Sequence, residues 1–572
     1  LSGYASRWTT GTTYPPPFNQ LTSFHNNGHI QNFVNPDQVL GELSGLDDLR
    51  TETLYVRTNL VNIYKHWISV ADFDGFRLDT VKHADVGVWQ HFNSEIRSFA
   101  SAIGKTNFFQ FGEVYDGSDS KCGYYTGTKA GGAFANDAVV DFPMYFKVND
   151  VFATAAGNTK QIEDRYNAIA GNYDPYAENR LVTFIDNHDR PRFMSAAGNN
   201  TNRLALALSW LYSARGIPCL YYGTEQNFNG SGDPNNREDM FDGLFEQGPS
   251  LGDNFNMTQG SFLHVARLNN LRRLYPALRR GAHLNRWNNP SGPGLFAYAR
   301  RLGDEEVLVI FNTASASQTL PNRPTLYTAG TVMVNLLNTN ETLTVVSGAD
   351  GMPPISVPAG SIKMFMPADR VLPLDPVVTV QSPAHYATNI VATAPVTLTF
   401  SKPMDTNATQ AAFSVQPPVG GSFAWSTNRT QLTFRPNPGF AGSTAIVIRV
   451  GTNAADGISG NRFHSAFETR FHTAPASFTD AVPPLILVDV PHDGALLSNT
   501  VVFSGRAADN VAVQRVEWRI NGDEWTTASG TTSWVASIDS RNFLNGSQQF
   551  AARAFDSSGN ASTAALRSVR FF

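Results

Sequence analysis

Apolar residues in the first half of the chain alternate between helical spacing and short continuous runs. Intervals of four, three and four residues within residues 52–69 predict the apolar face of one helix, formed by Val56, Leu60, Ile63 and Trp67. Two more helices are predicted over residues 86–103 and 202–215. Nearly continuous apolar runs, which are typical of buried strands, lie between these helices at residues 74–79, 107–114, 180–189 and 217–225. Helices that alternate with such strands indicate a parallel sheet covered by helices.

From about residue 280 onward the pattern changes to short alternating runs separated by Thr, Ser, Asn, Pro and Gly. Alternation at residues 396–400 and 516–520 is typical of half-buried strands in β-sandwiches. Proline-containing linkers at residues 370–376 and 479–484 divide this half into three units of roughly 90–100 residues, a usual size for a sandwich. The predicted fold class is therefore multidomain, with an α/β part followed by all-β sandwich domains.

Composition narrows the possible classes of protein. The 572 residues carry a formal net charge of −5 and no basic block, so nucleic acid is not an expected partner. No apolar run reaches the roughly 18 residues of a membrane span. The two cysteines, Cys122 and Cys219, are too few for a disulfide framework, and we expect two buried thiols.

Acidic residues stand at the ends of the predicted strands. Asp79 and Glu113 are 34 residues apart, about one strand–helix unit, and Asp189 follows 76 residues later, about two units. Since the strands of a parallel barrel point the same way, these carboxylates should converge on the face where barrel active sites lie. Three such groups suit glycoside chemistry, because one can attack a sugar carbon, one can protonate the leaving oxygen and one can stabilise positive charge. They could instead bind a divalent metal, or could simply be loop residues at strand ends.

The motifs around these acids resemble those of one known family. "DGFRLDTVKH" (74–83), "GEV" (112–114) and "FIDNHD" (184–189) are similar to regions of the α-amylase family, glycoside hydrolase family 13. Three more segments are similar to family regions and stand in the family's order along the chain: "GLDDL" (45–49), "GIPCLYYGTE" (216–225) and "GDPNNRE" (232–238). The resemblance covers about residues 40–275.

The resemblance implies a role for each matching residue. Asp79 would be the nucleophile that forms a β-glycosyl enzyme, Glu113 the general acid and then the base, and Asp189 the stabiliser of an oxocarbenium-like transition state. Arg77, on the same strand face as Asp79, would hold that carboxylate ionised. Lys82 and His83 would line the leaving-group side of the cleft. His188 would hydrogen-bond sugar hydroxyls beside Asp189, and Asp233 and Arg237 would contact sugars on the donor side. Alternatively, Lys82 could be merely solvated, and Asp233 and Arg237 could pair only with each other.

The family fold is an eight-stranded barrel, of which we can place only strands four to eight. Residues 1–50 resemble the remaining part of the inserted B domain, and residues 51–278 the C-terminal portion of the catalytic barrel. Because the open strand edges are a liability, we expect this chain to have little or no activity by itself. Asp48 and the backbone carbonyl of His83 match calcium ligands, so calcium is the expected cofactor of the complete enzyme, with an incomplete site here.

The second half of the chain resembles domains that accompany such barrels. Residues 279–370 resemble the antiparallel C domain of the family, and residues 377–475 and 483–572 resemble bacterial immunoglobulin-like modules. Such modules occur mostly on secreted or cell-surface proteins, so we expect that location. Three tryptophans could form a sugar-binding platform, although buried sandwich tryptophans are commoner: Trp425, Trp525 and Trp534.

The resemblance as a whole implies a retaining hydrolase that cleaves α-1,4-glucosidic bonds in starch-like polysaccharides or oligosaccharides and acts as a monomer. A transglycosylase or a cyclodextrin-acting enzyme of the same family is an alternative. A non-catalytic glucan-binding protein is an alternative from a different class, because the predicted barrel is incomplete.

Overall fold

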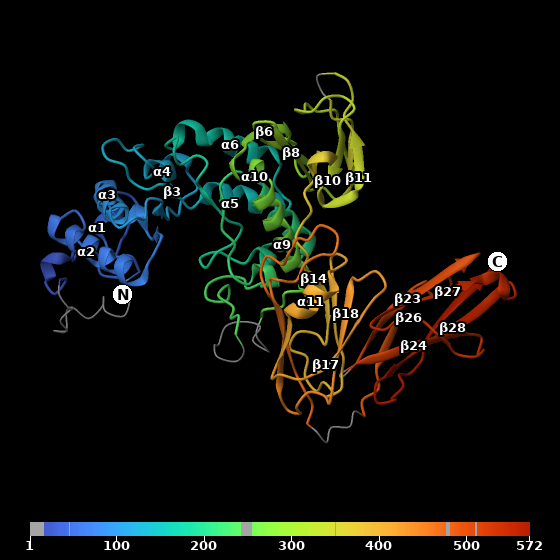
Figure 1. Ribbon diagram of the computed structural model, residues 1–572. Coiled ribbons are helices and arrows are strands. Elements are labelled where there is room, and N and C mark those ends of the chain that lie inside the picture. Colours follow the sequence, from blue (N-terminus) through green and yellow to red (C-terminus); the bar gives the residue numbers. More distant parts are fainter. Residues whose placement is uncertain (1–16, 45, 242–253, 349–350, 476–480, 510–511) are drawn as a thin grey trace. The chain divides into compact units, whose positions relative to one another are not determined.

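The computed structural model describes residues 17–44, 46–241, 254–348, 351–475, 481–509 and 512–572. Many of its helices and strands are labelled in Figure 1. Contacts divide the chain into two compact units. The first unit contains Leu1–Asn254 and Gly260–Leu372, and the second contains Phe255–Gln259 and Pro373–Phe572.

Within its described residues, the first unit contains five short parallel strands. These are β1 (Gly75–Leu78), β2 (Phe109–Gly112), β3 (Ala138–Val139), β4 (Val182–Thr183) and β5 (Ile217–Pro218). The strands β1, β2 and β3 pair in chain order, and β4 pairs with β5. A parallel bridge from Val140 to Val182 joins the two groups. The apolar pattern located four of these strands, and β3 is the strand required by the long spacing between Glu113 and Asp189.

Three predicted helices are confirmed as α2 (Leu54–Ala71), α3 (Val86–Ala102) and α8 (Thr201–Ser213). Each begins where a side-chain oxygen caps the first turn, from Thr53, Asp85 and Asn200. The other α-helices described in this unit are α1 (Asp37–Leu40), α4 (Asp119–Tyr124), α5 (Phe142–Val148), α6 (Lys160–Asn172), α7 (Phe193–Ala196), α9 (Gly260–Leu274) and α10 (Pro276–Arg280). The predicted alternation of helix and strand is therefore present.

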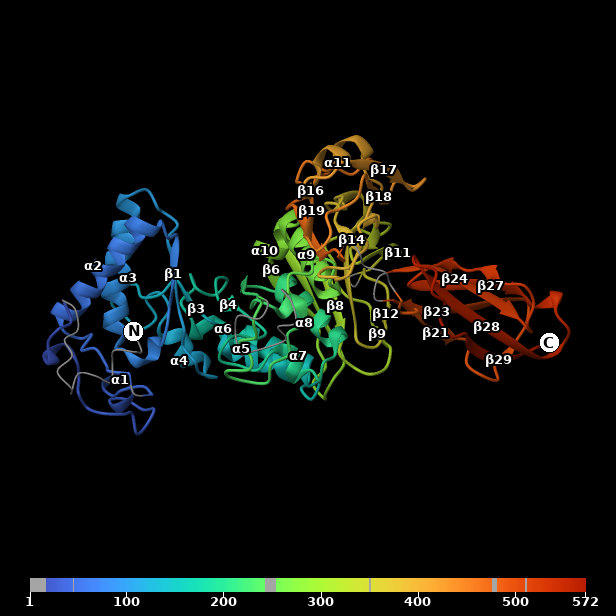
Figure 2. The ribbon, with the colours of Figure 1, turned by 90° about the horizontal axis from the view of Figure 1, so that it is seen from below.

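The predicted apolar face of α2 is only partly correct. Trp67 is 48% exposed, which contradicts its placement on a packed face. The buried residues of the helix are Val56, Val61 and Ile68. At 3.6 residues per turn, this buried side is rotated by roughly a quarter turn from the predicted stripe. The reason is that α2 lies beside α3 (Figure 1; Figure 2), where Tyr64 meets the rings of Phe76 and Phe92.

Antiparallel strands follow the helices in the first unit. They are β6 (Ala282–Trp287), β7 (Leu295–Leu302), β8 (Glu305–Asn312), β9 (Gln318–Leu320), β10 (Val332–Asn335), β11 (Asn338–Thr344), β12 (Ile355–Val357) and β13 (Ser361–Pro367). One sheet has the order β11-β10-β13-β8-β7-β6, and β12 pairs with β9. Buried residues of these strands, among them Leu308, Ile310 and Phe365, form one apolar cluster.

The second unit contains two β-sandwiches, each with its own apolar core. The strands of the first are β14 (Val378–Ser382), β15 (Val396–Phe400), β16 (Phe413–Gln416), β17 (Gly421–Trp425), β18 (Gln431–Pro436), β19 (Ala445–Val450) and β20 (Phe467–His472), with the helix α11 (Thr406–Ala412). They pair as β14-β15-β18-β17 and β16-β19-β20. Residues 396–400 alternate buried and half-buried positions, as predicted.

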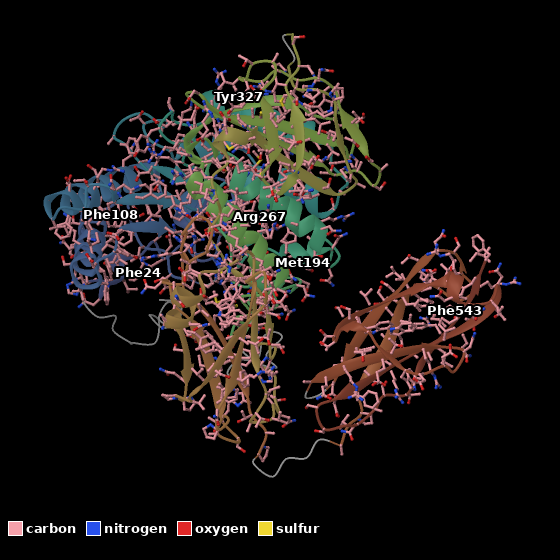
Figure 3. All side chains as sticks on the ribbon, turned by 45° about the vertical axis from the view of Figure 1, so that its right-hand side comes forward. Phe24, Phe108, Met194, Arg267, Tyr327 and Phe543 are labelled. Atoms are coloured by element: carbon pink, nitrogen blue, oxygen red, sulfur yellow. The ribbon has the colours of Figure 1, made fainter. Side chains whose placement is uncertain are left out.

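The strands of the second sandwich are β21 (Leu485–Val490), β22 (Leu496–Leu497), β23 (Thr500–Ala508), β24 (Val513–Ile520), β25 (Thr526–Thr527), β26 (Ser529–Gly530), β27 (Ser533–Asp539), β28 (Gly546–Asp556) and β29 (Ala565–Phe571). They pair as β21-β23-β27-β26 and β22-β29-β28-β24-β25. Phe543, labelled in Figure 3, packs against the core of this sandwich.

The structure also decides two side-chain predictions. Trp534 is only 1% exposed within the second sandwich core, so it cannot belong to an exposed sugar platform. Trp425 is half-buried and stacks on Phe400. Cys122 is buried as predicted, whereas Cys219 is exposed, because it follows β5 at the strand end.

Over the described residues, no helix has the length and apolar character that crossing a membrane requires.

Candidate active site

The carboxyl ends of β1 and β2 bring two acidic side chains together. Leu78 lies opposite Gly112 in the parallel ladder, so the next residue of each strand, Asp79 and Glu113, emerges at the same edge of the sheet. Arg77 Nη1 lies 3.2 Å from Asp79 Oδ2, and its Nη2 lies 3.4 Å from Glu113 Oε1. Two of the three predicted catalytic acids are therefore neighbours that share one guanidinium.

The backbone around this pair is tightly constrained. A Cβ atom added to Gly75 would lie 2.4 Å from the carbonyl oxygen of Phe109, so only glycine lets β1 approach β2 this closely. Immediately after Asp79, Thr80 has a φ of 50°, a left-handed conformation that is unfavourable for a β-branched residue. The amide of Val81 then donates to the carbonyl of Glu113 at 2.9 Å. Strain of this kind is concentrated at functional sites, where surrounding contacts hold it in place.

Burial and charge move the pKa values of the two acids apart. Burial raises the pKa of Glu113 to about 7, and its hydrogen bond with Asp79 adds to that effect. Burial also acts to raise the pKa of Asp79, but the hydrogen bond with Glu113 and the charge of Arg77 hold that pKa below its ordinary value. Below about pH 7 the pair therefore contains a protonated Glu113 beside an ionised Asp79. A proton donor next to a carboxylate is the arrangement that an acid–nucleophile pair needs.

This pKa difference predicts how activity depends on pH. We expect kcat/KM for a soluble maltooligosaccharide to fall as the pH rises through about 7, because Glu113 then loses the proton that it must donate. On the acid side, the lowered pKa of Asp79 should keep this carboxylate ionised, and the enzyme active, to below the ordinary aspartate range. A pH profile of kcat/KM tests both limbs. A decline of activity that begins near 4.5, the ordinary glutamate value, would contradict the assignment of Glu113 as the acid.

A second group of polar and charged residues lies on the loops after β4 and β5. His188 Nε2 is 3.3 Å from Asp189 Oδ2, and Arg237 Nη2 is 3.8 Å from Asp189 Oδ1. Arg237 Nε is also 2.9 Å from Asp233 Oδ1 and donates to the carbonyl of His188 at 3.3 Å. Asp233 and Arg237 therefore do pair, but not only with each other, because Arg237 also reaches Asp189. The structure thus brings together four of the residues that the family motifs singled out.

Two residues that the sequence motifs did not indicate connect these groups. Arg190 Nη1 donates to the hydroxyl of Tyr115 at 2.8 Å, and its Nε donates to the hydroxyl of Tyr145 at 3.1 Å. Tyr115 stands two residues beyond Glu113, whereas Arg190 follows Asp189 directly. The contact therefore ties the end of β2 to the end of β4. Tyr115 lies three residues beyond β2 and Arg190 seven residues beyond β4, and no sequence pattern marked either residue.

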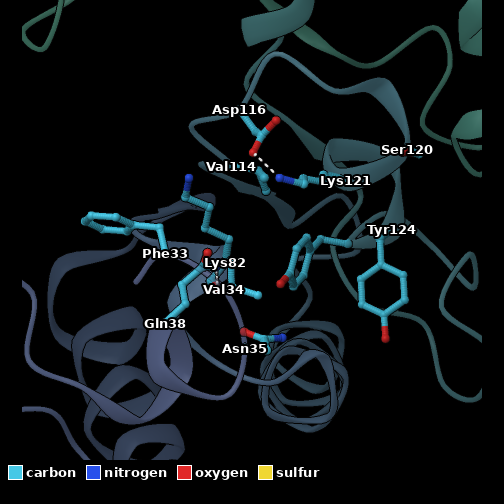
Figure 4. A pocket seen from close by; sticks show the side chains of 11 residues that line it. Phe33, Val34, Asn35, Gln38, Lys82, Val114, Asp116, Ser120, Lys121 and Tyr124 are labelled. Carbon is cyan, nitrogen blue, oxygen red and sulfur yellow. Dashed lines mark hydrogen bonds and ion pairs between the residues drawn. The ribbon is translucent and has the colours of Figure 1, made fainter. Parts of the chain in front are cut away.

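Lys82 lines a pocket beside the first group, and His83 is the next residue of the chain. Lys82 Nζ donates to the carbonyl of Tyr115 at 2.6 Å, so this lysine is not merely solvated. His83 Nδ1 lies 3.2 Å from the carbonyl of Gln38, and burial lowers the pKa of this histidine. The pocket has a volume of about 470 Å³ and is drawn in Figure 4. Its lining residues are Phe33, Val34, Asn35, Gln38, Lys82, Val114, Asp116, Ser120, Lys121, Tyr124 and Tyr125.

Asp48, which the resemblance indicates as a calcium ligand, contacts a histidine side chain. Asp48 Oδ2 is 2.5 Å from His25 Nδ1, and the other ring nitrogen of His25 is 3.0 Å from Glu52. In the described part of the chain, no three His, Cys, Asp or Glu side chains gather as a metal site. Because Ca²⁺ takes six to eight oxygen ligands, Asp48 and the carbonyl of His83 do not fit it by themselves. Calcium stays a prediction, and no chemical step here depends on it.

The sequence and the structure were compared with those of known proteins. Residues 8–248 match the family described as alpha amylase, catalytic domain. A solved α-amylase from Anoxybacillus is 30% identical, with a TM-score of 0.51, over 60% of this chain and 70% of that one. The chain belongs to the α-amylase family. After this family's catalytic region, residues 374–473 match a bacterial Ig-like domain and residues 484–552 a bacterial Ig domain.

Two curated members of the α-amylase family show how much of a relative this chain covers. A β/α-amylase of Paenibacillus polymyxa is 33% identical over 315 residues, which are 53% of this chain and 23% of the relative. A cyclomaltodextrin glucanotransferase of Paenibacillus macerans is 32% identical over 335 residues, or 57% of this chain and 42% of the relative. The chain thus spans less than half the length of either protein.

Proposed function

We propose that this α-amylase family chain carries a retaining hydrolase site for α-1,4-glucosidic bonds in starch-like glucans. The observation that carries the proposal is that Asp79 and Glu113 emerge at one edge of the sheet and both contact the guanidinium of Arg77, at 3.2 Å and 3.4 Å. Inverting glycosidases separate their two carboxyl groups by about 6.5–9.5 Å to admit a water molecule, whereas retaining enzymes hold them about 5–5.5 Å apart. Two carboxyl groups that contact the same guanidinium lie close together, which supports the shorter, retaining separation.

The proposed reaction has two displacements. In the first, a carboxylate oxygen of Asp79 attacks the anomeric carbon while Glu113 protonates the glycosidic oxygen, so the C–O bond breaks and a β-glycosyl ester forms. In the second, the Glu113 carboxylate takes a proton from water, whose oxygen attacks the anomeric carbon and releases Asp79. Arg77 keeps Asp79 ionised, and Asp189 stabilises the positive charge that develops on the sugar ring.

The remaining predicted residues are proposed to bind sugar on either side of the scissile bond. His188, Asp233 and Arg237 would contact the donor side, because they surround Asp189. Lys82 and His83 would contact the leaving-group side, where the pocket drawn in Figure 4 begins. From the Ig-like domains we also propose a secreted or cell-surface location, which fractionation of the producing cells would test.

Two measurements test the proposed mechanism. Proton NMR of maltooligosaccharide cleavage should show that the α-anomer appears first, because two inversions at the anomeric carbon give net retention. Incubation with 5-fluoro-α-glucosyl fluoride, followed by peptide mass spectrometry, should place a glycosyl ester on Asp79, and none on the Asp79→Asn variant. Release of the β-anomer, or a label on another residue, would contradict the mechanism. Because labelling needs only a single displacement, it also detects a site of very low turnover, and a chain that becomes labelled on no residue would reject the proposed function.

Transfer of the glycosyl group to a sugar is a second candidate, because a cyclomaltodextrin glucanotransferase matches this chain at 32% identity, as closely as the solved α-amylase does at 30%. The first displacement would be the same, and a sugar hydroxyl would replace water in the second. Chromatography of the products separates the two candidates: products longer than the substrate, or cyclic products, indicate transfer, and only shorter products indicate hydrolysis.

A further inference from the structure

The segment of residues 229–238 is folded tightly beyond β5. A Cβ atom added to Gly230 would lie 1.8 Å from the carbonyl oxygen of Asn235, so two stretches of this segment touch backbone to backbone. Glu238 Oε1 accepts hydrogen bonds from the amides of Asn229 and Gly230, each at 2.7 Å. The Glu238 carboxylate therefore joins the two ends of the segment, and this contact restricts the conformation of residues 231–237.

A buried ion pair fastens this segment to the chain after β4. Arg192 Nε donates to Glu238 Oε2 at 2.8 Å, and the two side chains are only 0% and 5% exposed. The guanidinium also lies 4.0 Å from the ring centre of Tyr221, and the amide of Arg192 donates to the carbonyl of Gly230 at 3.0 Å. Because removing one partner of a buried pair leaves an uncompensated charge, this contact holds the two loops at one separation.

Asn236 lies between these two loops and is completely buried. Its Nδ2 donates to the carbonyls of His188 at 2.9 Å and of Arg190 at 2.8 Å, the residues on either side of Asp189. With the amide turned the other way, Oδ1 would face two carbonyl oxygens, so the donor contacts define its orientation. Among the described residues Oδ1 has no partner, and the two donated bonds are therefore what this side chain contributes.

We propose that Asn236 is the positioning residue for Asp189. A buried side chain cannot touch a sugar, so it acts through the backbone that carries the carboxylate. The role assigned to Asp189 rests on the proposed function, but the hydrogen bonds from Asn236 to the backbone of residues 187–190 do not. Arg237, the next residue, reaches Asp189 directly. One short stretch of chain thus supplies both a backbone support and a charged contact to the same acid.

The test compares two asparagines with the same kind of hydrogen bonding. Asn312 on β8 is also fully buried, and its Nδ2 donates to the carbonyls of Ala316 at 2.8 Å and Val357 at 2.9 Å. We expect Asn236→Ala and Asn312→Ala to lower the midpoint of thermal unfolding similarly. Only Asn236→Ala should lower kcat, by about 30- to 100-fold with less than about fivefold change in KM, because small misplacements of a catalytic group cost about a hundredfold.

Amide hydrogen exchange supplies a readout that does not need activity. In the full chain, exchange at residues 187–190 should be faster in Asn236→Ala and unchanged in Asn312→Ala. Equal kcat losses in both variants, or unchanged exchange at these amides, would overturn the proposal. If the parent chain is not labelled by the glucosyl fluoride, the proposed function fails, and exchange alone decides the role of Asn236. If Asn236→Ala does not fold, Asn236→Ser, which keeps one donor, should show a smaller change in the same direction.

Discussion

Replacement of Asp79 by asparagine is expected to lower the turnover of maltooligosaccharides by about 10⁴-fold or more. An amide cannot form the glycosyl ester of the first displacement, although it keeps nearly the shape of the carboxylate. Glucan binding should therefore remain close to that of the parent. The measurements are steady-state turnover and the dissociation constant of a maltooligosaccharide by calorimetry.

Asp74 supplies a matched control within the same motif. Its side chain is 90% exposed and pairs with Lys105 at the opposite end of β1 from Asp79. The variant Asp74→Asn removes one carboxylate from "DGFRLD" and should leave turnover close to that of the parent. If Asp79→Asn retained turnover within about tenfold of the parent, the assignment of the nucleophile would be wrong, since removal of such a residue costs several orders of magnitude.

Replacement of Glu113 by glutamine is expected to have a large effect that depends on the leaving group. For a natural glucan, turnover should fall by about 10²- to 10⁴-fold, the usual contribution of a general acid. For α-glucosyl fluoride the loss in the first displacement should be much smaller, because fluoride departs without a proton. The alkaline fall in kcat/KM near pH 7 should also disappear, because the group with the raised pKa is then absent.

Glu163 is a suitable control for this variant. Both glutamates are 6% exposed, but Glu163 bonds His283 Nε2 at 3.0 Å, away from the strand ends. Glu163→Gln therefore reports the cost of replacing a buried carboxyl group, and it should not change the dependence on the leaving group. Equal losses of Glu113→Gln on glucan and on glucosyl fluoride would show that Glu113 is not the acid.

The sequence by itself determined the order of elements and the residues at the strand ends. Local periodicity separates a helix such as α3 from a strand such as β2, because side chains repeat every 3.6 residues in one and every two in the other. The acids Asp79 and Glu113 could be predicted to meet, because parallel strands direct their carboxyl ends to one edge. The resemblance to the family motifs also indicated the loop that contains Asp233 and Arg237.

Only the tertiary structure decided what each side chain packs against. The exposure of Trp67, the burial of Trp534 and the exposure of Cys219 depend on which elements pack nearby, and periodicity does not encode that. The raised pKa of Glu113 likewise requires its burial and its contact with Asp79.

The contact of Asn236 with residues 187–190 spans 46 to 49 positions of sequence. A lone asparagine in a loop has no periodicity, and its two donated hydrogen bonds exist only because the loops after β4 and β5 fold against each other. Residue type and spacing therefore indicated the reacting groups. The residues that hold those groups in place became visible only once distant segments of the chain were brought into contact.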